Sequence, residues 1–316
     1  VIPTSGENGQ KNYRSGKYSK FSHRDEVAFP GYYAVKLPKL GILAELTASE
    51  RVGVHRYTFS GKELPHILID VSSALGKNKA SEGEVQIDPE KQEVNGTIRT
   101  SGSFAGRYGG AKVYFTARSN QPFSEFGVWS GNQFYKNQAT VKGDQIGVDL
   151  GFGKGNADQV VELRLGISYV SIENARANLE AEAGNLSFDA VQQKAIQVWE
   201  DKLSLIKIEG GTPDQQKIFY SALYRSMQMP TLFNDANGDY MGFDKKVHQT
   251  TDFIYFTDLS LWDTFRTNHP LYTLIVPKYQ RNMMVSLVKM CEQGGVLPRW
   301  PFGYGYRGSM IGASAD

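Results

Sequence analysis

Residues 160–184 read VVELRLGISYVSIENARANLEAEAG, and the pattern of the chain changes within this stretch. Before Ser171 the side chains are largely apolar or β-branched, which is typical of a β-strand. Ser171 can cap a helix that carries Ala175 and Leu179 on one face, because these residues recur at helical spacing. The stretch therefore predicts that an all-β part gives way to an α-helical part near residues 171–187.

The chain before this boundary consists of short apolar and aromatic runs separated by glycine, proline, asparagine and aspartate. Such runs predict strands, and no helical periodicity lies between them. About ten short strands joined by tight turns favour an antiparallel β-sandwich over βαβ units. The predicted strands cover residues 32–37, 42–47, 52–59, 64–71, 84–88, 93–100, 112–118, 126–130, 145–150 and 160–171.

The chain after the boundary predicts helices. Ser187 can cap a second helix, and Thr212 begins a capping box with proline at the first helical position. Two more helices are expected over residues 260–267 and 277–292, with a hairpin-like stretch over 237–256 before them. The sequence therefore indicates a multidomain protein in which the β part comes first and the α part second.

The composition excludes several classes of protein. The chain has 316 residues with 35 basic and 33 acidic side chains, and this near balance argues against a nucleic-acid-binding surface. It contains no run of about 18 apolar residues, so no membrane-spanning helix is expected. The single cysteine, Cys291, excludes an internal disulfide framework.

Residues 261–266, LWDTFR, combine aromatic rings, a carboxylate and a guanidinium in one short segment. A site that binds a sugar needs this combination, because flat apolar sugar faces meet aromatic rings and hydroxyl groups take charge-assisted hydrogen bonds. An aspartate in the first turn of a helix is also favoured by capping and by the helix dipole alone. Trp262, Asp263 and Arg266 are therefore candidate binding residues, and a purely structural Asp263 is the alternative.

A second group of aromatic residues lies in segment 300–308, WPFGYGYRG. Glycine and proline interrupt the segment, so it cannot form a regular helix or strand that would bury all four rings. Loops often carry binding residues. Trp300 is therefore a further candidate, and packing of the rings against their own domain is an equally open alternative.

Two other segments resemble ligand-binding loops but are better explained as turns. Residues 234–239, NDANGD, place oxygen-bearing side chains at alternate positions, but the glycine and glutamate that an EF-hand requires are missing. Residues 151–156, GFGKGN, lack the Gly-Lys-Ser/Thr ending of a phosphate loop. The turn preferences of Asn, Asp and Gly account for both segments.

Four blocks of sequence follow one another in a fixed order. They are FSHRDEVAFPGYYAV (residues 21–35), AELTA with RVG and HRYTF (44–59), SLWDTFRT with PL and P (260–277), and GGVLPRW with SMIG (294–312). Together, in this order and with compatible spacing, these blocks resemble glycoside hydrolase family 92, the bacterial exo-acting α-mannosidases. The resemblance runs along almost the whole chain.

This resemblance implies an N-terminal antiparallel β-sandwich over residues 1–170, a helical linker over 171–210 and the beginning of an (α/α)6 toroid barrel over 211–316. It implies an enzyme that hydrolyses terminal α-linked mannose, of the α-1,2-mannosidase type, from mannosides or N-glycans with inversion of configuration. Inversion requires a carboxylic acid at the leaving oxygen and a second carboxylate that activates a water on the opposite face. The implied cofactor is Ca²⁺, which would hold the hydroxyl groups of mannose.

The resemblance assigns substrate-binding roles to Trp262, Asp263, Arg266 and Trp300. The two tryptophans would stack on the sugar or form the pocket wall, and the other two residues would hydrogen-bond its hydroxyl groups. No metal ligand is assigned within the chain, because the general acid, the general base and most calcium ligands are expected in motifs beyond Asp316. The 316 residues alone are therefore expected to be inactive, and the remainder of the polypeptide to be needed to complete the barrel.

Two alternatives remain open at this point. One is a non-catalytic carbohydrate-binding protein that uses the β-sandwich as a lectin module. The other is a different (α/α)6 sugar enzyme, such as a phosphorylase. For the mannosidase, the expected partner is a mannose-containing glycan, and the resemblance implies a bacterial protein of the periplasm, the cell surface or the medium.

Overall fold

The computed structural model describes residues 1–6, 9–102, 105–153 and 158–315. The chain divides into two compact units. The first comprises Val1–Thr100 and Lys112–Ile196, and the second comprises Ser101–Ala111 and Gln197–Asp316. Segment Ser101–Ala111 thus belongs to the second unit although it interrupts the first. The three-part division with a linker over 171–210 stays a prediction.

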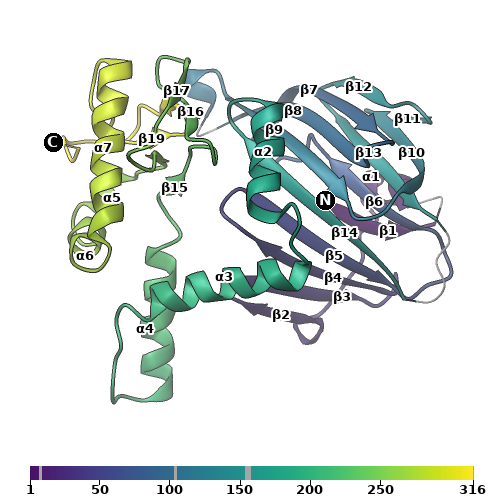
Figure 1. The fold of residues 1–316 in the computed structure, drawn as a ribbon, viewed down its shortest axis with the longest axis horizontal. Helices are drawn as coiled ribbons and strands as arrows, with labels where there is room; N and C mark the ends of the chain where they lie inside the picture. The colour runs from purple at the N-terminus through teal and green to yellow at the C-terminus, as the bar shows by residue number, and fades with distance from the viewer. Residues whose placement is uncertain (7–8, 103–104, 154–157, 316) are drawn as a thin grey trace. The chain divides into compact units, whose positions relative to one another are not determined.

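Two sheets make up the first unit, which confirms the predicted antiparallel β-sandwich (Figure 1). Within the described residues, five strands form one sheet in the order β1 (Ile2–Ser5), β6 (Pro65–Asp70), β13 (Ile146–Phe152), β10 (Phe123–Ser130) and β11 (Gln133–Lys136). Nine form the other in the order β12 (Thr140–Gly143), β7 (Lys79–Asp88), β8 (Glu93–Ser101), β9 (Ala111–Ser119), β14 (Gln159–Ser168), β5 (Val52–Phe59), β4 (Ile42–Ala48), β3 (Tyr32–Leu37) and β2 (Glu26–Phe29), again counting the described residues.

Strand β5 has buried side chains on both of its faces. Tyr57 and Phe59 belong to the core between the sheets, whereas Val52 and Val54 belong to a second apolar cluster that includes Leu179. Because successive residues of a strand point to opposite faces, the two pairs lie on opposite sides of the sheet. Side chains of this one strand therefore belong to two separate apolar clusters.

Helix α2 (Ile172–Ala183) begins where the sequence predicts and packs on the nine-stranded sheet (Figure 1). The hydroxyl group of Ser171 caps it by accepting a hydrogen bond from the N–H of Asn174 at 3.0 Å. The helix comes very close to β14 at Gly166, where an added Cβ would lie 2.4 Å from the carbonyl oxygen of Ala175. The second predicted helix is α3 (Phe188–Leu203), whose residues divide between the two units.

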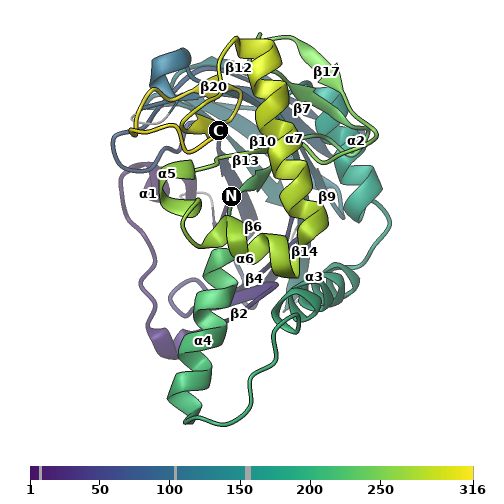
Figure 2. The ribbon, with the colours of Figure 1, turned by 90° about the vertical axis from the view of Figure 1, so that its left-hand side faces the viewer.

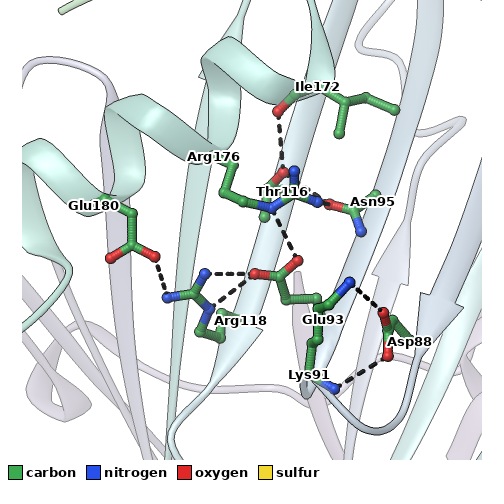
Figure 3. Close-up of polar contacts among 9 residues, drawn as sticks. All are labelled: Asp88, Lys91, Glu93, Asn95, Thr116, Arg118, Ile172, Arg176 and Glu180. Carbon is green, nitrogen blue, oxygen red and sulfur yellow. Dashed lines mark hydrogen bonds and ion pairs between the residues drawn. The ribbon is translucent and has the colours of Figure 1, made fainter.

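Figure 3 shows a polar network that ties α2 to the sheet. Glu93 of β8 is 1% exposed, and its carboxylate accepts hydrogen bonds from Arg118 of β9 at 2.5 and 3.0 Å and from Arg176 of α2 at 3.1 Å. Arg118 also donates to Glu180 of α2 at 2.5 Å. Burial by itself raises the pKa of Glu93, but the two arginines outweigh burial and lower this pKa below its ordinary value. Charges therefore hold α2 in place in addition to apolar packing.

Several short elements of the first unit are not among the predicted ones. They are β1, β2, β11, β12, the helix α1 (Gly9–Arg14) and the 3₁₀ turn η1 (His23–Asp25). Each has at most six residues, and the four strands all lie at sheet edges. A run of four residues offers too few positions for an alternating apolar pattern to stand out. The turn predicted over residues 151–156 falls largely outside the described residues.

Among its described residues, the second unit contains the remaining helices and three small strand pairs. Its helices are α4 (Pro213–Ser226), α5 (Leu261–Thr264), α6 (Asn268–Ile275), α7 (Pro277–Gly294) and the 3₁₀ turn η2 (Gly106–Tyr108). Its strands pair as β15 (Thr231–Leu232) with β18 (Phe256–Thr257), β16 (Asp239–Met241) with β17 (Val247–Gln249), and β19 (Pro301–Phe302) with β20 (Gly305–Tyr306). The capping box at Thr212 and the hairpin-like stretch are confirmed.

The predicted helix over residues 260–267 is wrong in its extent. Helix α5 has only four residues, and α6, which the sequence pattern did not predict, follows it. Pro270 lies in the first turn of α6, where a missing N–H costs nothing, so this proline does not stop the helix. The long helix α7 comes next (Figure 2). No helix of the described residues is long and apolar enough to cross a membrane.

Candidate functional site

Helix α5 and the residues directly after it present three of the four predicted binding residues on the surface of the second unit. Leu261 is buried and anchors the short helix, whereas Trp262, Asp263 and Arg266 are exposed. The hydroxyl group of Ser260 donates to the Asp263 carboxylate at 2.5 Å. Asp263 therefore has a local structural partner and still faces solvent, where a ligand can reach it.

Arg266 lies against the aromatic rings of its own segment. Its guanidinium carbon is 4.1 Å from the centre of the Trp262 ring and 4.6 Å from the centre of the Phe265 ring. One of its N–H groups also donates to the carbonyl oxygen of Trp262. Stacking on a ring holds the planar guanidinium in one orientation, so fewer conformations are lost when it hydrogen-bonds a ligand.

Trp300 stands at the start of a tight hairpin and has an arginine of its own. The guanidinium carbon of Arg307 lies 3.9 Å from the centre of the Trp300 ring. Arg299 donates to the Tyr306 hydroxyl at 2.7 Å and to the Met310 carbonyl oxygen at 2.9 Å. The predicted aromatic loop is thus a hairpin in which Arg307 contacts the Trp300 ring and Arg299 contacts Tyr306.

Packing against Tyr108 shapes this hairpin. Gly303 has a φ of 57° and turns the chain between β19 and β20. A Cβ added to Gly305 would lie 2.2 Å from the Tyr108 ring, and the ring of Tyr304 packs at 5.6 Å from that of Tyr108. Part of the aromatic loop therefore does pack within its own unit, as one alternative expected, while Trp300 keeps a partly exposed position.

Residues just before α5 hold the hairpin and so connect the two predicted segments. Thr257 donates to the carbonyl oxygen of Gly303 at 2.6 Å, and Asp258 accepts from the N–H of Gly303 at 3.1 Å. At the other end, a Cβ added to Gly312 would lie 4.0 Å from the Trp262 ring. The blocks that contain Trp262 and Trp300 are therefore neighbours within the second unit.

Asp258 is a site residue that the sequence reasoning missed. Burial raises the pKa of its carboxyl, and hydrogen bonds from Thr231 and Gly303 only partly oppose this rise. Asp258 also has a φ of 60°, in the left-handed region. Arg307 was missed as well, because its contact with Trp300 is visible only once the hairpin has formed.

The described residues provide no evident metal centre. They contain no group of three or more His, Cys, Asp or Glu side chains that could hold an ion. Residues 234–239 form a turn in which Asn237 accepts from the N–H of Asp239 at 3.0 Å and donates to its carboxylate at 2.8 Å. These side chains are therefore engaged with each other, as the turn reading predicted.

The arrangement suits the binding of a polyhydroxylated ligand. Trp262 and Trp300 offer aromatic surfaces, Arg266 and Arg307 offer charged donors, and Asp263 offers a charged acceptor. Aromatic planes and charge-assisted hydrogen bonds together recognise sugar rings. Hydrolysis needs more than this, because an inverting glycosidase places two carboxyl groups on opposite sides of the scissile bond.

Comparison with known proteins gives the same picture for both halves of the chain. The glycosyl hydrolase family 92 N-terminal domain matches residues 1–168, and the glycosyl hydrolase family 92 catalytic domain matches residues 174–316. A curated relative, an uncharacterised secreted glycosidase of Arthroderma benhamiae, is 30% identical over 250 residues, which cover 69% of this chain and 31% of the relative.

Solved structures of family 92 enzymes are similar over nearly the whole chain. An α-mannosidase from Bacteroides thetaiotaomicron, also solved in complex with mannoimidazole, has a TM-score of 0.89 and 26% identity over 99% of this chain and 43% of its own. An inverting mannosidase from the same organism has a TM-score of 0.87 and 29% identity over 99% of this chain and 41% of its own.

The chain thus spans less than half the length of these solved relatives and about a third of the curated one. The order of the four sequence blocks, the β-sandwich followed by helices and the two family matches all lead to one assignment. This chain belongs to glycosyl hydrolase family 92, with residues 1–168 in the family's N-terminal domain and residues 174–316 in its catalytic domain.

Proposed function

We propose that the protein to which this chain belongs is an exo-acting α-mannosidase that removes terminal α-linked mannose, of the α-1,2 type, from mannosides or N-glycans with inversion of configuration. The observation that carries the proposal is the similarity, at 26–29% identity over 99% of the chain, to two family 92 mannosidases. One of these binds mannoimidazole and the other is described as inverting. The exposed aromatic and charged side chains around α5 support a role in holding the sugar.

In this proposal Trp262 and Trp300 form the wall of the sugar pocket, and Asp263 and Arg266 hydrogen-bond hydroxyl groups. The Asp263 carboxylate can accept from two hydroxyl groups, since it is exposed and has one donor, Ser260, within the segment. Arg266 is oriented by the Trp262 ring and can donate in turn. The acid and the base that perform inversion are expected beyond Asp316.

The test is release of mannose from α-1,2-linked mannobiose by the full-length protein. Asp263→Asn keeps the size of the side chain and removes its charge. A hydrogen bond to a charged group contributes about 1.5–3 kcal/mol, so we expect kcat/KM to fall about 10–100-fold. Nuclear magnetic resonance of the first product formed should show β-mannose if configuration inverts.

Asp214→Asn is the matched control, because Asp214 is also an exposed acid in the first turn of a helix, α4. It should leave kcat/KM unchanged. An equal loss in both variants would remove Asp263 from the site. Absence of mannose release by the full-length protein would overturn the proposed activity, and the 316 residues alone are expected to release none.

We also propose that the protein acts outside the cytoplasm of a bacterium, in the periplasm, on the cell surface or in the medium. The curated relative from Arthroderma benhamiae is described as secreted, which supports export. Fractionation of the native cells with an antibody to the protein tests this proposal, and recovery from the cytoplasm alone would contradict it.

A further inference from the structure

A cavity lies in the first unit, on the outer face of the five-stranded sheet. His66 of β6 and Asp149 and Gly151 of β13 alternate with core residues such as Ile67 and Leu150. Alternate residues of a strand share a face, so these three point away from the core between the sheets. His66 and Gly151 stand opposite each other in the strand register.

His66 and Asp149 form a pair that is almost fully buried. The Nδ1 atom of His66 lies 2.7 Å from the Asp149 carboxylate, and each side chain is only 7% exposed. An ionised carboxylate only accepts hydrogen bonds, so this contact requires a proton on Nδ1. The other ring nitrogen, Nε2, is buried and has no hydrogen-bond partner among the residues that the structure describes. A buried polar atom without a partner is costly, so this atom requires an explanation.

A cavity of about 230 Å³ adjoins this pair. Its walls include Phe134, and its mouth includes the exposed ion pair of Lys136 and Glu125, whose charged atoms are 3.2 Å apart. Gly151 keeps the space open, because an added Cβ would lie 3.1 Å from the His66 ring and 3.2 Å from Glu125. The buried pair, the Phe134 ring and the missing side chain of Gly151 together shape this cavity.

The chemistry of the walls selects the class of ligand. Each charged side chain of the walls has a partner, because Lys136 pairs with Glu125 and Asp149 lies within hydrogen-bond distance of His66. The cavity offers donors and acceptors next to the aromatic ring of Phe134, which is the combination that a sugar ring meets. Its volume lies below the roughly 300–1,000 Å³ of drug-sized pockets, so a single ring is the fitting size.

We propose that this cavity binds one neutral sugar ring, with the Nε2 atom of His66 hydrogen-bonded to a hydroxyl group. Such a site would hold a glycan through the β-sandwich without cleaving it. The proposal rests on residues of the first unit and does not depend on the proposed hydrolysis.

The test uses full-length protein with ¹³C at the Cε1 atom of histidine. The signal that is missing in His66→Gln belongs to His66. D-Mannose has no glycosidic bond to cleave, so we expect it to shift this signal in a saturable way up to about 10 mM, ten times a millimolar Kd. No shift at that concentration would overturn the proposal, and a shift with inorganic phosphate but not with mannose would overturn the ligand class.

Lys136→Ala separates binding from folding, because Lys136 is 61% exposed and its removal leaves the core intact. It should weaken the mannose Kd at least about threefold, since Lys136 lines the cavity and can donate a charged hydrogen bond to a sugar hydroxyl group. Lys91→Ala is the matched control: Lys91 is 70% exposed and pairs with Asp88 at the same 3.2 Å, but in a turn outside the cavity. Equal affinities in these two variants would contradict a contact between the sugar and this cavity.

Discussion

Glu93 is almost fully buried, and its carboxylate accepts hydrogen bonds from two guanidinium groups that belong to different elements. Arg118 belongs to the sheet and Arg176 to α2, so the charge of Glu93 holds a helix and a strand at one point. Removing one member of a buried charge group leaves the others desolvated without compensation. The contribution of this contact to the free energy of unfolding is therefore best measured in a variant that neutralises the carboxylate alone.

We expect Glu93→Gln to lower the free energy of unfolding by about 2 kcal/mol. Fully buried pairs lose about 3–5 kcal/mol, and the loss is smaller here because Arg118 and Arg176 keep 28% and 34% of their side chains exposed. Denaturation in urea measures the difference. Glu84→Gln is the control, since Glu84 pairs with Lys142 at the surface and is 53% exposed. A change in the control as large as in Glu93→Gln would contradict the role of burial.

The pH dependence of this difference follows from the direction of the pKa shift. The pKa of Glu93 is lower in the folded protein than its ordinary value. A carboxyl of this kind contributes stability above the unfolded pKa, which is about 4.3 for glutamate, and loses it as the pH falls through the folded pKa. The gap in melting temperature between wild type and Glu93→Gln should therefore narrow below about pH 4. A difference in melting temperature that stays constant from pH 7 to below about pH 4 would contradict the lowered pKa of Glu93 in the folded protein.

The candidate site shows what a local pattern can and cannot predict about single residues. Asp263 and Arg266 stand in one short segment with Trp262, so their residue types alone indicated a polar and aromatic surface. Asp258 contacts Gly303, which is 45 residues further along the chain, and Arg307 contacts Trp300 only because the hairpin brings its two strands together. Local composition does not contain such information.

At the scale of elements, α2 can approach β14 closely because Gly166 has no side chain. Gly166→Ala would place a methyl group 2.4 Å from the Ala175 carbonyl oxygen and 3.0 Å from Leu179, so the helix must shift. Overpacking of this kind costs about 1–3 kcal/mol, and we expect such a loss in urea denaturation. Gly53→Ala, in the neighbouring strand β5, is the control, because its nearest atom would be 3.6 Å away. Similar losses in both variants would show that the α2 contact is not the cause.

The elements that the sequence predicted well have a strong apolar pattern. The bounds of β3 and β5 agree with the predicted strands, because aromatic and β-branched residues fill both runs. Helix α6 escaped prediction because its eight residues contain Pro270 and lie beside the very short α5. Helices of two turns depend on tertiary packing more than on their own sequence.

At the scale of the whole molecule, we expect mannose release by the full-length protein to depend on Ca²⁺. A bound metal ion contributes several kcal/mol to charge stabilisation, so exhaustive chelation should lower the rate at least about 100-fold. Ca²⁺ should restore the rate better than Mg²⁺, which demands stricter octahedral geometry. Undiminished release of mannose after chelation would contradict the dependence on Ca²⁺ that the family resemblance implies.

Asn237→Ala is the matched control for that experiment. Asn237 lies in the turn that resembles a calcium loop, and its side chain is engaged with Asp239. The variant should keep the same calcium dependence as the wild type. A weakened affinity for calcium would instead place the ion in this turn.

The path of the chain between the units also sets an order of events during synthesis. Gly110 and Tyr304 meet in the second unit but lie 194 residues apart, and Tyr108 packs on the same tyrosine. A ribosome adds about 5–20 residues per second, so the segment around Tyr108 emerges roughly 10–40 s before its partner. During that interval strands of the sandwich can already pair, while Ser101–Ala111 has nothing of its own unit to pack against. This segment can therefore fold into its unit only after the residues around Tyr304 have been made.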